Sequence, residues 1–190
     1  MFSPITPTVE PRHLAFPGHN GVSPAASQAS WYAAYVCVRH EKMVARQFAS
    51  RDLECFLPMY RTVHRWKDRY KGLDLALFPG YVFVRIELKD RVRVLQVPSV
   101  VSLVGFDGRP VPIHDNEVET LRHGLDGQVR IEPHPYLKEG RRVRIKAGPF
   151  IGAEGILLRK KDCCRVVLSI DLLMRSVAVE VSEADVEVVG

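Results

Sequence analysis

The cysteines and histidines are the residues of this chain that are best suited to metal or redox chemistry. The four cysteines are Cys37, Cys55, Cys163 and Cys164, and no two of them form a C-x-x-C pair. The seven histidines add no cluster at ligand spacing, so we expect no zinc and no other metal. The vicinal pair Cys163–Cys164 could support redox chemistry, but adjacent strand residues point to opposite faces. Buried or half-buried free thiols are therefore the main expectation, and a thiol-dependent enzyme is an alternative.

Three glycines in AGPFIGAEGILL, at positions 148, 152 and 155, are a second candidate for chemistry. A phosphate-binding loop of the Walker type needs Gly-Lys-Ser/Thr at the start of a helix, whereas strand-like residues follow here. We expect these glycines to allow tight bends between strands. The sequence contains no G-x-S-x-G and no H-E-x-x-H motif, so it predicts a protein without catalytic residues or cofactors.

Basic residues are concentrated between Arg39 and Lys71. That segment has nine basic and four acidic residues, whereas the remainder of the chain has 18 of each. The whole net charge of +5 therefore lies in one segment. A face that meets a polyanion such as nucleic acid is one interpretation, and a solvated surface loop is the other.

The N-terminal half predicts an α+β domain. Residues 31–40 and 54–63 have strand-like composition, and between them Val44 and Phe48 recur at helical spacing from Glu41. We expect residues 64–72 to form an exposed loop or hairpin tip, residues 81–86 and 100–105 to form strands, and Asp107–Gly108 to form a turn. A second helix should run from Asp115, as N-cap, to about residue 123. The element order predicts an antiparallel sheet over residues 30–125 with helices on one face.

The remaining segments differ in composition. Residues 1–29 are rich in Pro, Ser and Ala and should be a disordered tail, and residues 126–138 have no period and should be a linker. Residues 139–190 contain short alternating runs such as RRVRIK, CRVVLSI and SVAVEV. These runs predict a small all-β barrel. We find no signal peptide and no apolar run long enough for a membrane helix, so a cytoplasmic, monomeric protein is expected.

The run LALFPGYVFVR contains an irregularity, because Pro79 and Gly80 interrupt an otherwise strand-like segment. Proline cannot donate to a sheet ladder, and glycine is a poor strand residue. This run, the aromatic opening strand WYAAYVCVRHEKMVARQF and the later GRRVRIKAGPFIGAEGILLR together resemble the NusG family of bacterial transcription elongation and antitermination factors. The resemblance covers about residues 30–190 and implies an N-terminal NusG domain followed by a KOW domain. The segment RHEKMVA and the long tail look more like the specialised paralogues of the UpxY and RfaH type.

The resemblance implies a binding surface for RNA polymerase. Family members grip the clamp helices of the β′ subunit with the segment that matches Phe78, Pro79, Gly80 and Tyr81, and Tyr35 matches a pocket aromatic of RfaH. Phe78 and Tyr81 could instead be core residues. Residues 91–93 fall where RfaH contacts the β gate loop, although its His-Thr-Thr motif is replaced here by Arg-Val-Arg.

The resemblance also implies contacts to DNA and to a second protein. Upstream or non-template DNA would meet phosphate-binding basic residues and one stacking aromatic, namely Arg39, Lys42, Arg46, Arg51, and Trp66 or Tyr70. The KOW domain of the family recruits a small-subunit ribosomal protein or Rho, and the matching residues are Phe150, Leu172, Leu173 and Met174. Three large apolar residues in a row cannot all point inward, so at least one of residues 172–174 should be exposed. A ribosome-associated KOW protein that binds ribosomal RNA is the alternative function.

Overall fold

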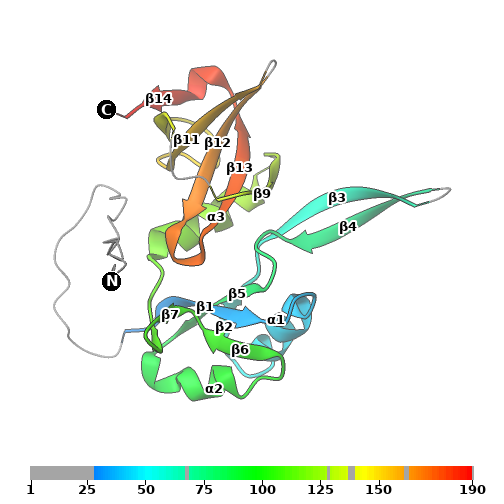
Figure 1. Cartoon of the computed structure of the whole chain (residues 1–190), viewed down its shortest axis with the longest axis vertical. Coiled ribbons are helices and arrows are strands. Elements are labelled where there is room, and N and C mark those ends of the chain that lie inside the picture. The colour runs from blue at the N-terminus through cyan, green and yellow to red at the C-terminus, as the bar shows by residue number, and fades with distance from the viewer. Residues whose placement is uncertain (1–27, 67–68, 128, 137–139, 161–162, 190) are drawn as a thin grey trace, which may run out of the picture.

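The computed structural model describes residues 28–66, 69–127, 129–136, 140–160 and 163–189. The predicted disordered tail therefore lies almost wholly outside the described residues. Two antiparallel sheets dominate the chain, a four-stranded one near the N-terminus and a six-stranded one near the C-terminus (Figure 1). The predicted α+β class with an all-β C-terminal region is confirmed.

The N-terminal sheet has the strand order β2-β5-β1-β6. Its strands are β1 (Ser30–Val36), β2 (Glu54–Phe56), β5 (Tyr81–Ile86) and β6 (Val100–Leu103). Strand β1 is apolar on both faces: Tyr32 and Ala34 belong to one buried cluster, and Trp31 and Ala33 belong to another. A strand of this composition needs a covering layer on each side of the sheet.

Helices cover both faces of this sheet. Helices α1 (Glu41–Ala49) and α2 (Arg91–Leu95) lie on one face, where Val44, Phe48 and Val94 share a buried cluster with β1 and β5. Helix α3 (Asp115–Asp126) packs Val118 and Leu121 against the other face. The prediction that the helices lie on one face only is therefore wrong, because the apolar residues of β1 and β5 point both ways. Asp115 is the first helical residue, and His114 takes the N-cap position.

A long hairpin projects from the N-terminal sheet (Figure 1). It consists of β3 (Met59–Trp66) and β4 (Arg69–Ala76). Of the two alternatives for residues 64–72, the hairpin is therefore correct, and residues 64–66 and 69–72 are paired strand. A smaller hairpin joins β7 (Gly105–Phe106) to β8 (Arg109–Pro110). Its turn residues Asp107 and Gly108 have φ of 48° and 72°, which confirms the predicted turn and fits the I′ type of two-residue hairpins.

The C-terminal sheet has the order β14-β10-β11-β12-β13-β9. Its consecutive strands are β10 (Arg142–Ile145), β11 (Glu154–Lys160), β12 (Cys163–Ile170), β13 (Arg175–Val181) and β14 (Val186–Val188), with the short 3-10 segments η2 (Asp171–Leu173) and η3 (Glu183–Asp185). The sixth strand, β9 (Ile131–His134), comes from the segment that we predicted to be a linker. That segment therefore contributes an edge strand to the sheet.

Helix α3 lies between the two sheets (Figure 1). One continuous apolar cluster contains Trp31 and Phe83 of the N-terminal sheet, Leu121 of α3, and Phe150 and Val177 of the C-terminal region. Cys37, Cys55 and Cys164 are free thiols. In the described parts of the chain, no helix is long and apolar enough to span a membrane, and no group of acidic, His or Cys side chains has the arrangement of a metal site.

Candidate functional site

Residues 78–81, Phe-Pro-Gly-Tyr, form a tight turn at the entrance to β5. The backbone N–H of Tyr81 donates to the carbonyl of Phe78 at 3.1 Å, and Gly80 has φ of 84°. Proline at the second position and a positive-φ glycine at the third are the requirements of a type II turn. The Gly80 carbonyl then accepts from the N–H of Val36 at 2.8 Å. The irregularity in the sequence is thus a turn that joins the end of the hairpin to the sheet.

An exposed apolar surface surrounds this turn, and we call it the tyrosine surface (Tyr35, Val38, Pro79 and Tyr81). Tyr35 and Tyr81 are directly opposite in the register of β1 and β5, with ring centroids 5.6 Å apart. Tyr35 is 40% exposed and Val38 is 59% exposed, while Pro79 is exposed and Tyr81 is half-buried. A Cβ at position 80 would lie 3.4 Å from the Tyr35 ring, so glycine also allows this ring to lie close to the turn.

Glu41 holds the turn from the opposite face of the sheet. Its carboxylate is buried and accepts a hydrogen bond from the backbone N–H of Gly80 at 2.8 Å. A bond between a carboxylate and a buried N–H is stronger than one between neutral groups. The contact joins residues 39 positions apart in the chain, so no local sequence pattern could have predicted that Glu41 positions the tyrosine surface.

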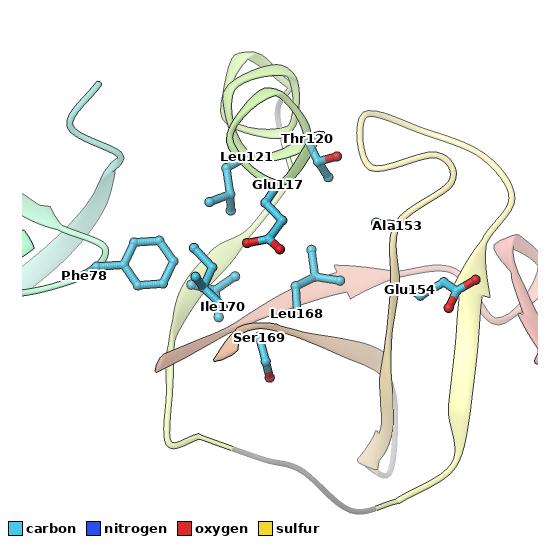
Figure 2. Close-up of a pocket in the computed structure, with 10 residues that line it drawn as sticks. Phe78, Glu117, Thr120, Leu121, Ala153, Glu154, Leu168, Ser169 and Ile170 are labelled. Carbon is cyan, nitrogen blue, oxygen red and sulfur yellow. The ribbon is translucent and has the colours of Figure 1, made fainter. Parts of the chain in front are cut away.

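Phe78, which we predicted to face the polymerase, is only 1% exposed. Its ring packs edge-on against Phe83 at 5.9 Å between centroids. On its other side it points into a crevice between the two sheets, toward Leu121 of α3 and Ile170 of β12 (Figure 2). Within the turn, Pro79 and Tyr81 therefore reach the surface, while Phe78 and Gly80 are buried.

The Glu117 carboxyl makes this crevice electrostatically unfavourable when it is ionised. Glu117 of α3 points its carboxylate between Phe78, Leu168 and Ile170 (Figure 2). Burial among these apolar groups, and then the negative charge of Asp171, raise the pKa of Glu117 to about 7. The other acidic residue of the crevice wall is Glu154, whose carboxylate Arg144 holds at 2.5 Å. Contact between α3 and the C-terminal sheet is therefore favoured when Glu117 is protonated.

We expect the packing of α3 against the C-terminal sheet to weaken as pH rises. A carboxyl whose pKa is raised on packing contributes most below its ordinary pKa of 4.5, and the contribution is lost as pH passes through about 7. The melting temperature of the protein should therefore fall between pH 5 and pH 8, and Glu117→Gln should flatten that dependence. Asp107→Asn, in the exposed β7–β8 turn, is the matched control. A Gln variant with an unchanged pH slope would contradict this assignment.

The predicted nucleic-acid residues surround α1 and the hairpin. Lys42 and Arg46 are exposed on α1 and border a groove with Met59 at the base of β3. In the described part of the chain, neither cation forms an ion pair. Arg39 is exposed, Arg51 is half-buried, and Tyr70 on β4 is 73% exposed. Trp66 is the last residue of β3 and precedes the hairpin tip. Lys42 and Arg46 therefore lie on α1, Arg39 and Arg51 lie just before and after it, and Trp66 and Tyr70 lie on the hairpin.

The predicted partner-binding residues of the C-terminal region are mostly buried. Phe150 is 2% exposed, and a Cβ at position 124 of α3 would lie 2.0 Å from its ring. Leu173 is 5% exposed and Leu172 is half-buried, whereas Met174 is 66% exposed. The expectation that at least one residue of 172–174 is exposed is confirmed, and that residue is Met174.

Arg122 of α3 contacts two strands of the N-terminal sheet and stabilises the packing of the helix on it. Its guanidinium lies over the rings of Trp31 and Phe56, 5.1 and 5.2 Å from their centroids. It also forms ion pairs with Glu54 at 3.7 Å and Glu119 at 3.3 Å. Stacking of this kind is favourable when the cation is partly desolvated. Sequence reasoning gave Arg122 no role, because its partners on β1 and β2 are distant in the chain.

Comparisons with known proteins show which proteins this chain resembles. A family model described as "Transcription termination factor nusG" matches residues 29–122, a range that contains the tyrosine surface. The transcription termination/antitermination protein NusG of Escherichia coli K12 is 33% identical over 140 residues, which cover 70% of this chain and 77% of that protein. The NusG of Borreliella burgdorferi is 26% identical over 184 residues, which cover 83% of this chain and 97% of that protein.

A solved structure described as "Domain interaction in Thermotoga maritima NusG" has a similar fold. The TM-score is 0.57, and the match covers 86% of this chain and 98% of that chain at 21% sequence identity. At this level of identity the similarity concerns the fold alone.

Proposed function

Since this chain belongs to the NusG family of transcription termination/antitermination proteins, we propose that it binds RNA polymerase through the tyrosine surface. The observation that carries this proposal is the ring pair of exposed Tyr35 and half-buried Tyr81 beside a turn that Glu41 holds in place. Aromatic side chains on rigid strands are favourable anchors because little conformational entropy is lost when they bind. The partner surface would be the clamp helices of the β′ subunit, and binding there would oppose clamp opening, pausing and termination.

Phe78 can join this contact only after a rearrangement. Its ring is covered by α3 and by Ile170 of the C-terminal sheet, so a polymerase helix that reaches Phe78 must first displace the sheet. Binding would then favour the separated arrangement by its difference in affinity for the two states. The tyrosine surface, which is exposed already, would make the first contact.

The remaining proposed contacts use two further surfaces. Lys42 and Arg46, with Tyr70 on the hairpin, would meet upstream or non-template DNA, since exposed cations bind phosphates and an exposed ring can stack on an unpaired base. Met174 would contact a small-subunit ribosomal protein or Rho, because it is the exposed apolar residue of the predicted tip. Assignment to the specialised subgroup stays a prediction.

Transcription of a template with an intrinsic or Rho-dependent terminator tests the function directly. With purified polymerase, adding the protein should change the fraction of read-through transcripts and the lifetime of pauses. A pull-down from cell extract provides the second arm. Recovery of ribosomal subunits without RNA polymerase would contradict the proposal and favour the ribosome-associated alternative.

We expect Tyr35→Ala to weaken polymerase binding by about tenfold, because it removes half of the ring pair from the proposed interface. Tyr35 is 40% exposed, so the melting temperature should change little. The matched control is Phe106→Ala, which removes a ring that is 64% exposed on β7 and has no part in the proposed contacts. Equal polymerase affinity for Tyr35→Ala and the unsubstituted protein, measured by titration of a labelled protein, would show that the tyrosine surface is not the contact.

A further inference from the structure

Strand β9 (Ile131–His134) covers the outer edge of β13 in the C-terminal sheet. It pairs antiparallel with β13, and Ile131 lies opposite Val179 while His134 lies opposite Ser176. On its other side β13 pairs with β12. The segment that connects the two sheets therefore closes an edge that would otherwise present unpaired backbone groups.

The direction of each backbone group in this pair follows from one hydrogen bond. The N–H of Glu180 donates to the carbonyl of Arg130 at 3.1 Å. Hydrogen-bonded and non-hydrogen-bonded pairs alternate along an antiparallel ladder, so Glu132 and Ala178 form the next hydrogen-bonded pair. Pro133, opposite Val177, then faces away from β13, where its missing N–H costs no ladder bond.

Besides its backbone pairing with β13, a small set of side-chain contacts holds β9 and the residues after it in place, and one of them is the Tyr136 hydroxyl, which donates to Asp171 at 2.9 Å. Glu132 forms an ion pair with Arg165 of β12, which it reaches across β13. The Arg165 side chain is only 14% exposed, so this contact is partly shielded from water. A second pair, between Glu132 and Arg130, is longer at 3.8 Å, and the Arg130 side chain is 70% exposed. Ile131 is the residue of β9 that reaches the buried apolar cluster. A four-residue strand with one such anchor depends strongly on its ion pair.

Pairing of β9 with β13 limits how far the two sheets can separate, because it shortens the segment that connects them. Helix α3 ends at Asp126 and β9 begins at Ile131, so five Cα–Cα steps, which span at most ~17 Å, connect the helix to the C-terminal sheet. Without β9 pairing, and once the hydrogen bond between Tyr136 and Asp171 has opened too, the connection runs from Asp126 to Arg142 at the start of β10. Sixteen steps span up to about 55 Å when extended. The C-terminal sheet can then leave α3 while α3 stays on the N-terminal sheet.

We propose that Ile131–His134 is a releasable strap, latched by Glu132 and Arg165, whose release both lengthens the connection between the sheets and uncovers the edge of β13. The longer connection and the uncovered edge arise together, because both require the backbone pairing between β9 and β13 to break. Separation of the C-terminal sheet from α3 thus requires the strap to open. The consequence for polymerase binding rests on the proposed function, whereas the strap itself does not.

Amide hydrogen exchange and NMR relaxation of the whole protein test this inference. The Ala178 N–H points toward β9, and the Val177 and Val179 N–H groups point toward β12, so these neighbours are internal controls. We expect Glu132→Ala to raise exchange at Ala178 about tenfold or more, because a charge-assisted contact is lost. Exchange at Val177 and Val179 should stay slow. The rotational correlation time of the C-terminal sheet should fall as it separates from the N-terminal sheet.

Two further variants make the test specific to the latch. Arg130→Ala removes only the exposed ion pair and should leave exchange at Ala178 unchanged. Glu132→Arg should accelerate it, and Glu132→Arg combined with Arg165→Glu should restore it. Fast exchange at Ala178 in the unsubstituted protein would overturn the strap, and so would faster exchange in Glu132→Ala with unchanged tumbling.

Polymerase titration of the same variants separates the two proposals. Stronger binding by Glu132→Ala, together with faster tumbling of its C-terminal sheet, supports both. If no variant binds polymerase, the proposed function fails while exchange and tumbling still decide the strap.

Discussion

Gly124→Leu is expected to separate the C-terminal sheet from α3 and, under the proposed function, to strengthen polymerase binding. A Cβ at position 124 would lie 2.0 Å from the ring of Phe150, a distance that no relaxed structure tolerates. Glycine is normally unfavourable inside a helix, and its replacement should stabilise an isolated α3 by about 0.5–1 kcal/mol. Here the substitution should instead disrupt the contact between the two sheets, because the close approach of α3 to Phe150 needs a residue without a side chain.

The size of the binding effect depends on how strongly the packed arrangement is favoured. If polymerase needs the separated state and that state is populated at about 1–10%, complete separation should raise the apparent affinity by about ten- to a hundredfold. NMR relaxation would report the separation, and titration with polymerase would report the affinity. The N-terminal sheet should keep its own chemical shifts, since the atoms nearest to a Cβ at position 124 belong to Phe150 and not to that sheet.

Two control experiments test whether the clash between position 124 and Phe150 causes the separation. Asn116→Leu adds the same side chain to an exposed position of α3 and should have no effect on either measurement. Phe150→Ala creates room opposite position 124, so Gly124→Ala should cost much less in that background than in the unsubstituted protein. Slow common tumbling of both sheets in Gly124→Leu combined with Glu132→Ala, which also releases the strap, would contradict the packing described here. Separation without any gain in polymerase binding would count against the role of Phe78.

The sequence predicted those parts of the fold that depend on local patterns. Helical spacing located α1 and α3, an apolar run located the strand that begins at Tyr81, and alternation located the one that begins at Arg142. Asp107–Gly108 predicted a turn, and both residues have positive φ. Strand β9 was missed because its four residues include a proline and have no period. This strand forms because its backbone pairs with the edge of β13 and its Glu132 forms an ion pair with Arg165. Both partners lie outside the strand.

In the candidate site, too, local features were predicted from the sequence, whereas features that depend on tertiary contacts were not. Residue types and the Pro-Gly turn drew attention to Tyr35 and residues 78–81. They left open whether Phe78 is a contact or a core residue, since Ile170, which lies beside it, is 92 positions away in the chain. Glu41 was placed on a helix by its spacing, while its bond to Gly80 is a product of the tertiary fold. Long-range pairing thus decides which aromatic residues remain available to a partner.

Leu173→Asp and Met174→Asp are expected to have opposite consequences, although the residues are neighbours. Leu173 is 5% exposed in the cluster that contains Ile170 and Val177, and a carboxylate there would lose its hydration without gaining a partner. We expect a cost of several kcal/mol and a fall in melting temperature of at least about 10 °C. Met174 is 66% exposed with φ of 48°, a conformation that aspartate tolerates better than most residues. Its substitution should change stability by less than about 0.5 kcal/mol.

This pair of variants also tests where a second protein binds to the C-terminal sheet. If Met174 is the contact, Met174→Asp should stay folded and lose affinity for either the small-subunit ribosomal protein or Rho, because a charge replaces the exposed apolar side chain of the tip. Titration of each purified partner against the variant would reveal which one is recruited. Normal binding of both partners would mean that the tip has another role. A melting temperature for Leu173→Asp close to that of the unsubstituted protein would show that Leu173 does not belong to the core, and the exposed contact would then extend beyond Met174.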